Sequence, residues 1–431
     1  MLSLQKIINS LKPDAPSLRM LYGDQREMLN KMSDRWRRLI ERFVELFGED
    51  GDILLFSTPG RTEVGGNHTD HNAGRVLAAA VDLDLISAAK PTDDGIITVY
   101  SEGYPKVVVD TRMLEAQEEE RYTTGALIRG ICARMQETGW KIGGFNACIT
   151  SNVPKGSGLS SSAAFEVGIV TILNHLYNEG RIDPVTNAII SQYAENHYFG
   201  KPCGLMDQTT CAVGGFVTID FRDSRNPMVQ KLDYDFSRSR HALVIVETGG
   251  DHADLTDDYA GITSDMRSVA QALGGKVLRD VSREQVLAAL PALRSKVSDR
   301  ALLRAFHFFD DNDRVVEQVN ALEKGNFQRF LELVNESGRS SWMQLQNNYS
   351  IRNPQHQGIA LAQTLTRYFL GNRGACRVHG GGFAGTIQAF VPVEMVEEYV
   401  SKMEGVFGEG ACYSVMIRSA GSVRLNLEKG E

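Results

Sequence analysis

The sequence contains no apolar run long enough to cross a membrane. Its longest apolar stretches, residues 76–81 and 242–246, have the length of buried strands, whereas a membrane-spanning helix needs about 20 residues. Residues 1–6 also lack the apolar core and the small-residue cleavage site of a secretory signal peptide. These absences predict a cytoplasmic protein that does not act at a membrane.

Cysteine and positive charge are both scarce. The six cysteines are scattered along the chain and none belongs to a CxxC pair, which favours reduced core cysteines over disulfides or a thiolate metal site. The formal net charge is −8 and the isoelectric point is about 5.7. An acidic chain of this kind argues against a nucleic-acid-binding surface, so no nucleic-acid partner is expected.

The common phosphate-binding loop, GxxxxGK[ST], is absent as well. The nearest candidate, Gly274-Gly275-Lys276, lacks the upstream glycine. Residues 154–164 read PKGSGLSSSAA, in which six of eleven residues are glycine or serine, and an apolar, helix-favouring run to residue 176 follows. A strand, a Gly/Ser loop and a helix place backbone N–H groups and a positive helix end against phosphate. The loop predicts nucleotide binding, although such a turn can also be purely structural.

The length of 431 residues predicts more than one core. We expect an N-terminal helical extension over residues 1–50, a first domain over 51–225 and a second domain over 226–431. No Pro/Ser-rich linker marks the boundary, so the two domains should pack tightly.

The hydrophobic pattern predicts a mixture of short strands and helices in both domains. Strands are expected over 53–57, 76–89, 96–100, 107–109, 241–247 and 412–417, with a hairpin at 213–221. Helices are expected over 124–138, 161–177, 185–198, 314–322, 327–335, 357–370 and 394–405.

Residues 59–72, PGRTEVGGNHTDHN, gather cationic, acidic and imidazole groups in what reads as a glycine-rich turn after a strand. Such a density of hydrogen-bonding groups suggests a polar ligand held at the mouth of a sheet. Two alternatives remain at this point. One is a metal site, because His68 and His71 flank Asp70, and the other is a purely structural turn.

Two further segments carry chemistry. In residues 194–208, Asp207 follows a Pro/Gly turn in apolar surroundings and is a candidate general base, while Glu195 is free to hold a divalent cation. Each acid taken singly is better explained as a surface or capping group. Residues 377–386 contain Gly380-Gly381-Gly382 and Gly385, where the backbone can approach a ligand closely, although a hairpin turn explains them equally well.

In their order and spacing, the four segments resemble the sugar and isoprenoid small-molecule kinases of the GHMP superfamily, and within it the galactokinase family. The resemblance runs from about residue 52 to residue 424. It implies an α+β fold of two domains, an N-terminal domain like domain 2 of ribosomal protein S5 and a ferredoxin-like C-terminal domain. The N-terminal helical extension lies outside it.

The resemblance also implies an activity, the ATP-dependent phosphorylation of the anomeric hydroxyl of a sugar, with D-galactose as the first candidate. Asp207 would accept the hydroxyl proton and Arg61 would neutralise charge around it. Ser162, with Ser161 as a second candidate, and Glu195 would hold Mg²⁺ on the phosphates. The residues implied in binding ATP are Lys155, Gly156, Ser157, Gly158, Leu159, Ser160, Ser161, Ser162 and Ala163, and those implied in binding sugar are Asn67, His68, Asp70 and Tyr259.

This chain departs from the galactokinase pattern in three places. Asn67 replaces a glutamate at the position that binds the outer hydroxymethyl group, His71 replaces a tyrosine, and Thr62-Glu63 replaces Val-Asn. Asparagine still offers an acceptor but is neutral and shorter. N-acetylgalactosamine, arabinose or a uronic acid are therefore alternative substrates.

Two other classes of function were weighed. A non-catalytic sugar sensor on the same fold would have a shortened Ser/Ala stretch, whereas residues 160–164 are full length and both Asp207 and Arg61 are present. A metal-dependent hydrolase would rest on His68 and His71. The expected partners are a small-molecule sugar and ATP, and the expected state is a monomer or a weak homodimer.

Overall fold

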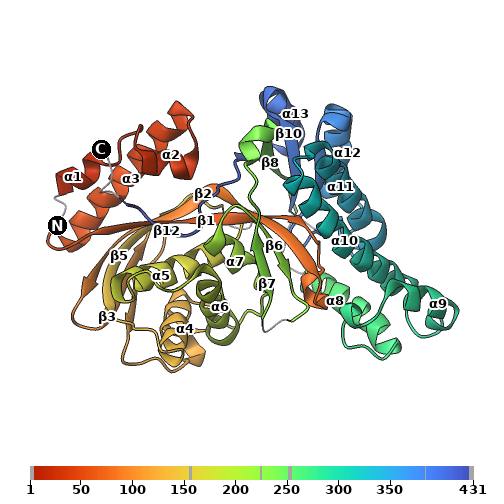
Figure 1. Ribbon diagram of the computed structural model, residues 1–431, viewed down its shortest axis with the longest axis horizontal. Helices are drawn as coiled ribbons and strands as arrows, with labels where there is room; N and C mark the ends of the chain where they lie inside the picture. The colour runs from red at the N-terminus through yellow and green to blue at the C-terminus, as the bar shows by residue number, and fades with distance from the viewer. Residues whose placement is uncertain (1–3, 155–157, 224–225, 251–254, 384, 427–431) are drawn as a thin grey trace.

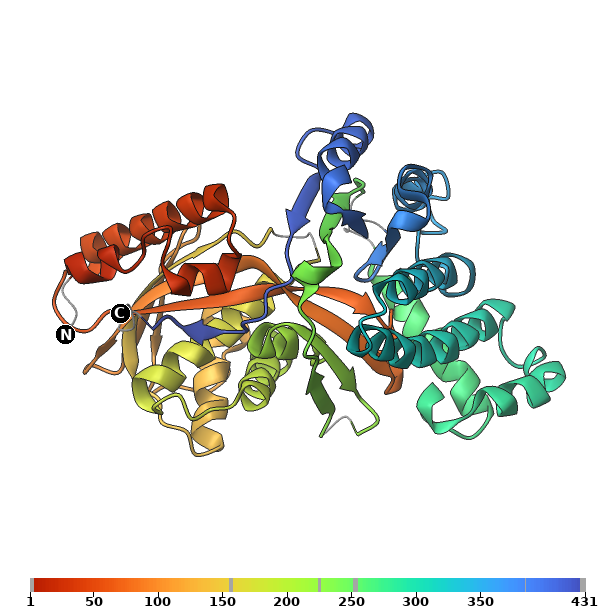
Figure 2. The ribbon, with the colours of Figure 1, turned by 45° about the horizontal axis from the view of Figure 1, so that its top comes forward.

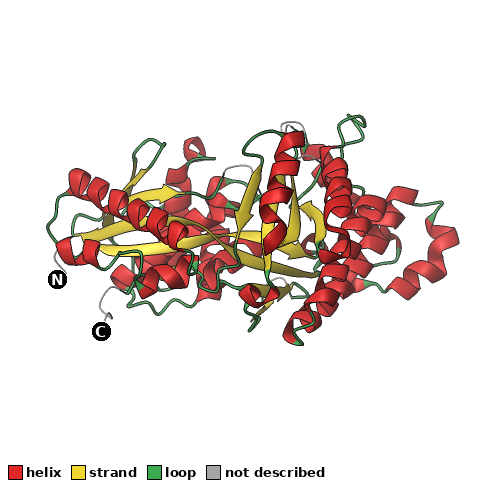
Figure 3. Ribbon diagram, turned by 90° about the horizontal axis from the view of Figure 1, so that it is seen from above, coloured by secondary structure: helices red, strands yellow, loops and turns green. Residues whose placement is uncertain are grey.

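The structure is a computed structural model that describes residues 4–154, 158–223, 226–250, 255–383 and 385–426. The molecule is elongated, with both ends of the chain at one end and a helical body at the other (Figures 1 and 3). Two sheets form its centre, one of eight strands and one of four. The expected residues Lys155, Gly156 and Ser157 lie outside the described part of the chain.

The eight-stranded sheet has the order β12-β1-β2-β5-β3-β4, and β6 and β7 form a further edge on β2. All pairs are antiparallel except β3 with β5. Its strands are β1 (Leu54–Gly65), β2 (Arg75–Thr92), β3 (Ile96–Ser101), β4 (Val107–Asp110), β5 (Gly144–Ser151), β6 (Phe216–Asp220), β7 (Met228–Lys231) and β12 (Val423–Arg424).

Helices cover both faces of this sheet, which explains why its long strands are almost continuously apolar. One face packs on α4 (Thr124–Glu137), α5 (Ser161–Tyr177) and α7 (Met206–Val213), and α6 (Pro184–Ala194) packs on these three helices. The opposite face carries the N-terminal extension (Figure 2). Successive residues of β1 divide between the faces: Leu55 packs with the extension and Phe56 with the core under α4 and α5.

In the described part of the extension the helices are α1 (Leu4–Asn9), α2 (Pro16–Tyr22) and α3 (Arg26–Phe47). Helix α3 buries residues at helical spacing against the sheet, among them Met32, Trp36 and Phe43. Gly48 ends the helix with a φ of 76°, a backbone conformation that glycine adopts without strain.

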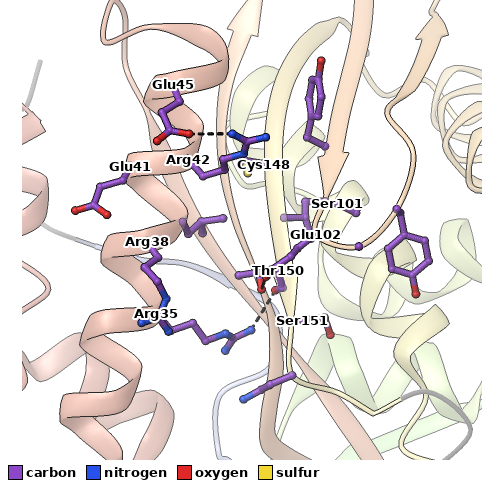
Figure 4. A pocket seen from close by; sticks show the side chains of 16 residues that line it. Arg35, Arg38, Glu41, Arg42, Glu45, Ser101, Glu102, Cys148, Thr150 and Ser151 are labelled. Carbon is purple, nitrogen blue, oxygen red and sulfur yellow. Dashed lines mark hydrogen bonds and ion pairs between the residues drawn. The ribbon is translucent and has the colours of Figure 1, made fainter.

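A buried ionic hub ties the extension to the sheet. Asp84 of β2 accepts hydrogen bonds from Tyr22 Oη at 2.8 Å and Arg35 Nη1 at 2.5 Å, and Arg418 Nη1 lies at 3.2 Å. Arg35 Nη2 also donates to the carbonyl of Thr150, at the end of β5 (Figure 4). Helix α3 and the ends of β3 and β5 enclose a cavity of about 670 Å³ beside this contact, seen in the same view.

The four-stranded sheet confirms the ferredoxin-like expectation. Its order is β11-β8-β10-β9 with every pair antiparallel. Read across the sheet, these are the fourth, first, third and second strands of this domain in chain order. The strands are β8 (His241–Glu247), β9 (Ala375–His379), β10 (Thr386–Pro392) and β11 (Cys412–Val415). One face packs on α12 (Gly358–Leu370) and α13 (Val396–Phe407), and the other on α11 (Phe327–Ser340).

The remaining helices form the far end of the molecule: α8 (Thr256–Ala272), α9 (Arg283–Leu293) and α10 (Asp299–Glu323). The expected domain boundary at residue 225 falls between β6 and β7, which pair with each other. The first sheet therefore extends past that boundary and also takes in β12 from near the C-terminus. No helix in the described ranges combines the length and the apolar character that membrane crossing requires.

Candidate active site

Strand β1 runs through the segment that reads as a turn in the sequence, so the expectation of a turn beginning at Pro59 is wrong. The strand continues to Gly65 by means of register shifts at Pro59/Arg61 and Glu63/Gly65. Gly60 permits this course because a Cβ there would lie 2.8 Å from the carbonyl oxygen of Leu159. The next residue, Arg61, donates its backbone N–H to that same carbonyl at 3.0 Å.

Arg61 and Asp207 form a two-point ion pair. Arg61 Nε lies 2.7 Å from Asp207 Oδ1, and Arg61 Nη2 lies 2.5 Å from Asp207 Oδ2. Arg61 Nη1 also donates to the carbonyl of Gly158, and the Ser160 hydroxyl donates to Asp207 Oδ2 at 2.6 Å. The two predicted catalytic residues therefore meet at the Gly/Ser loop.

The surroundings of Asp207 keep its carboxylate ionised. Asp207 lies in the first turn of α7, where the helix end favours negative charge. Burial acts to raise its pKa, but the charge of Arg61 and the hydrogen bonds from Arg61 and Ser160 outweigh burial. The pKa of Asp207 therefore lies below its ordinary value. With 30% of its side chain exposed, the carboxylate remains accessible to a ligand.

The described part of the Gly/Ser loop ends at the N-terminus of α5. Gly158 has a φ of 74° and Ser160 a φ of 61°, and the helix begins at Ser161. Ser161, Ser162 and Ala163 occupy the first turn, where backbone N–H groups have no intrahelical acceptor. Leu159 is fully buried and anchors the loop in the core between the sheets.

A cavity of about 510 Å³ adjoins this helix end. Ser161 and Ser162 lie at one side of it. The rest of the wall is mainly apolar and aromatic, including Tyr104, Tyr122, Leu127, Ile149 and Phe165. An apolar pocket beside a helix N-terminus has room for a planar base next to a phosphate chain.

Two buried carboxylates lie close to Asp207. The amide nitrogen of Gln208 donates to Glu166 Oε2 at 3.0 Å and to Glu195 Oε2 at 2.7 Å. Glu166 Oε1 has no hydrogen-bond partner among the described residues. Burial, and after it the charge of Glu195, raise the pKa of Glu166 well above its ordinary value.

The donor set suits Mg²⁺, which prefers oxygen ligands. Glu195 is the expected carboxylate, and the unpartnered oxygen of Glu166 adds a second one that the sequence analysis missed. Glu166 lies four residues after Ser162 on α5, a spacing that places both on one helix face and that could have revealed it. Within the described ranges, no three His, Cys, Asp or Glu side chains are grouped to hold a metal ion.

Three of the expected sugar residues contact one glycine turn. Asn67 Nδ2 lies 2.9 Å from the Gly380 carbonyl oxygen, His68 Nε2 lies 2.9 Å from that of Gly381, and Tyr259 Oη lies 3.0 Å from that of Gly382. The structure thus brings the segments around residues 67, 259 and 380 together, as one site requires.

Asp70 differs from these three residues. Its carboxylate accepts no hydrogen bond from any described side chain or backbone N–H, and Gly204 passes close by, since a Cβ there would lie 2.8 Å from Asp70 Oδ2. Burial lowers the pKa of His68 to about 4, so His68 is neutral near neutral pH. Its ring centroid lies 6.4 Å from that of His71, whose side chain is 48% exposed.

Comparison with known families decides the class of protein. Residues 126–215, which contain the Gly/Ser loop and Asp207, match the family model of the GHMP kinases N terminal domain. Residues 41–91, which contain Arg61 and Asp70, match the galactokinase galactose-binding signature. The chain is a sugar kinase that resembles the GHMP kinases.

Solved structures share the fold of this kinase. A Lactococcus lactis galactokinase complexed with galactose superposes with a TM-score of 0.77 at 23% identity, covering 91% of this chain and 100% of the other. The Methanococcus jannaschii mevalonate kinase has a TM-score of 0.60 at 15% identity, with 85% and 99% covered. A Bacteroides thetaiotaomicron D-glycero-D-manno-heptose 1-phosphate kinase has a TM-score of 0.58 at 15% identity, covering 86% of this chain and 99% of the other.

Proposed function

We propose that this kinase transfers the γ-phosphoryl group of ATP to the anomeric hydroxyl of D-galactose. The observation that carries the proposal is the Arg61–Asp207 ion pair at the Gly/Ser loop. A cation and a carboxylate that can accept a proton thus lie together beside the N-terminus of α5. Phosphoryl transfer mainly requires such positioning and charge neutralisation.

In the proposed reaction, the anomeric oxygen attacks the γ-phosphorus while its proton passes to Asp207. The bond from the γ-phosphorus to the bridging oxygen breaks, and ADP leaves with that electron pair. Arg61 keeps Asp207 ionised and stabilises the negative charge that develops on the transferred group. Asp70, His68 and Tyr259 line the sugar side and would hydrogen-bond its hydroxyls.

ATP would place its phosphates on the N-terminus of α5 and its base in the cavity of about 510 Å³. Mg²⁺ supplies neutralisation of phosphate charge when bound. Ser162 and Glu195 would hold it, with Glu166 as a further oxygen donor.

D-galactose is favoured by the galactose-binding signature and by the fold of the galactose-bound Lactococcus enzyme. N-acetylgalactosamine, arabinose and uronic acids are the alternatives, because residues 63, 67 and 71 depart from the usual pattern. The experiment is an assay of ADP release with galactose, N-acetylgalactosamine, arabinose, galacturonate and glucose. We expect galactose to be turned over. Binding of galactose without ADP release from any sugar would favour a sensor and contradict the proposal.

A further inference from the structure

The side chain of Asn67 is sealed inside the protein, with no exposed surface. Its amide nitrogen donates to Glu63 Oε1 and to the Gly380 carbonyl, both at 2.9 Å. Its amide oxygen accepts from Asn347 Nδ2 at 2.8 Å and from the Ser341 hydroxyl at 3.2 Å. Two donors and two lone pairs are the full capacity of an amide, so none is left for a ligand.

The backbone of Asn67 is also held by hydrogen bonds. Its N–H donates to Asp311 Oδ2 at 2.8 Å, and its carbonyl oxygen lies 2.9 Å from His307 Nε2. Both partners belong to α10. This single residue of the first sheet's loop is therefore bound through side chain and backbone to α10, to Ser341 and Asn347, and to the glycine turn.

Glu63 completes the arrangement. Its Oε1 accepts from Asn67 and, at 2.6 Å, from Arg377 Nη2, whose side chain is fully buried. Burial raises the pKa of Glu63, and the charge of Arg377 opposes this effect. A carboxylate at residue 67 would stand 2.9 Å from that of Glu63, an arrangement that costs energy in a buried site.

We infer that Asn67 is a positioning residue that fixes the loop 66–74 to the turn Gly380–Gly382, and that it does not touch the sugar. The inference rests on the proposed function for its kinetic test. Glu63 and Asn67 act as one carboxylate–amide pair. The galactokinase pattern has asparagine where this chain has Glu63 and glutamate where it has Asn67. The two departures therefore amount to one exchange of amide and carboxylate between these positions.

Substrate selectivity distinguishes positioning from contact. Asn67→Asp keeps the shape of the side chain and removes both donors. We expect kcat/KM to fall by about tenfold or more, and by the same factor for galactose, 6-deoxygalactose and arabinose. The KM for ATP should not change. A loss confined to galactose, the only one of the three sugars with a hydroxymethyl group at that carbon, would overturn the inference.

A charge exchange provides the second readout. In the double variant Glu63→Gln/Asn67→Asp, amide and carboxylate change sides, and we expect recovery of most of the lost kcat/KM for all three sugars. Asn72→Asp is the matched control, because Asn72 is a buried amide of the same loop whose partners lie in and beside α8. Glu63→Gln should not rescue it.

Thermal unfolding tests the pair without any substrate. Asn67→Asp should lower the midpoint of unfolding, and adding Glu63→Gln to this variant should raise the midpoint again. Adding Glu63→Gln to Asn72→Asp should not raise it. Absence of this rescue would overturn the inference whatever the activity. Rescue of stability in a protein that phosphorylates no sugar would instead support the pairing and contradict the proposed function.

Discussion

Among the single residues of the site, Arg61 has the most specific geometry. One guanidinium contacts both oxygens of Asp207 and the Gly158 carbonyl at once. Only arginine presents donors in such a planar fork, since a lysine ammonium is a point charge. Arg61 therefore sets the charge state of Asp207 and the position of the Gly/Ser loop together.

Arg61→Gln should move the pH dependence of turnover. In the unmodified kinase the pKa of Asp207 lies below its ordinary 3.8, so the base is ionised at all pH values above that range. Without the cation, burial dominates and the pKa rises, so kcat should acquire an acid limb in addition to a loss of about 100-fold or more. Profiles of kcat against pH for both proteins test this, and an unshifted acid limb would contradict it.

His68→Gln should flatten the pH dependence of stability. The pKa of His68 falls from 6.5 to about 4 on folding, so the unfolded chain binds the proton more readily. Stability from the neutral ring is present above pH 6.5 and declines as the pH falls toward 4. Glutamine retains a donor for the Gly381 carbonyl and does not titrate. Unfolding midpoints at about pH 7.5 and about pH 5 should differ less in the variant than in the unmodified chain. An equal difference between the two midpoints in both proteins would show that His68 does not contribute to the pH dependence of stability.

The sequence predicted which residue types meet in the site but not how their hydrogen bonds are shared. Asp207 and Arg61 were identified from short segments and lie together as expected. The partners of Asn67 come from residues 63, 307, 311, 341, 347 and 380, and no local pattern reveals such long-range pairing. Glu166 was missed because a carboxylate inside an apolar helix gives no signal by itself, although its spacing from Ser162 was a usable one.

At the scale of elements, α3 supports the stem of the Gly/Ser loop. Arg35 contacts Asp84 and also the Thr150 carbonyl, the second contact being visible in Figure 4. Asn152, two residues before Pro154, pairs with the backbone of Asp84. The side chains of Arg35 and Arg418 are both buried, and that of Asp84 has no exposed surface. The extension therefore contributes to the position of the loop as well as to the core.

Arg35→Met should destabilise the fold and weaken ATP binding. Breaking a buried ion pair costs about 3–5 kcal/mol, and the lower end applies because Arg418 still faces Asp84. We expect a lower unfolding midpoint and a higher KM for ATP, with the KM for sugar unchanged. Arg42→Met is the control, since Arg42 lies on the same helix and pairs only with exposed Glu45. Equal effects of the two variants would contradict this role of α3.

The elements predicted best are those with a regular pattern and a clear stop signal. Helix α5 and strand β8 have the expected bounds, whereas β1 continues through Pro59 and Gly60, which resemble a turn in the sequence. Helix α8 was missed although Ile262, Met266, Val269 and Ala270 have helical spacing, because polar residues separate them. The register shifts of β1 depend on contacts with Leu159 and Gln318 that the sequence does not display.

At the scale of the whole molecule, the chain crosses between the two sheets more than once. After β11, residues 416–424 return to the first sheet, where Val423 and Arg424 pair with Ser57 and Phe56. Arg418 donates to Ser57 Oγ at 2.7 Å and joins the Asp84 hub. The two halves therefore share structure and should unfold together.

Truncation near the C-terminus tests this coupling. A chain ending at residue 417 loses Arg418 and β12, which leaves Asp84 with one fewer cation and exposes an edge of β1. We expect its unfolding midpoint to fall sharply, with fluorescence and circular dichroism still changing together. A chain ending at residue 426 keeps both features and should match the full chain. Separate transitions for the two halves of the full chain would contradict the account.

A single variant tests whether Asp207 accepts the proton of the attacking hydroxyl. Asp207→Asn keeps the size of the side chain and an acceptor for Ser160 or Arg61, but removes the base. The account predicts that calorimetry will still detect galactose and ATP binding while kcat falls by about 100- to 10,000-fold. Turnover close to that of the unmodified kinase would contradict it.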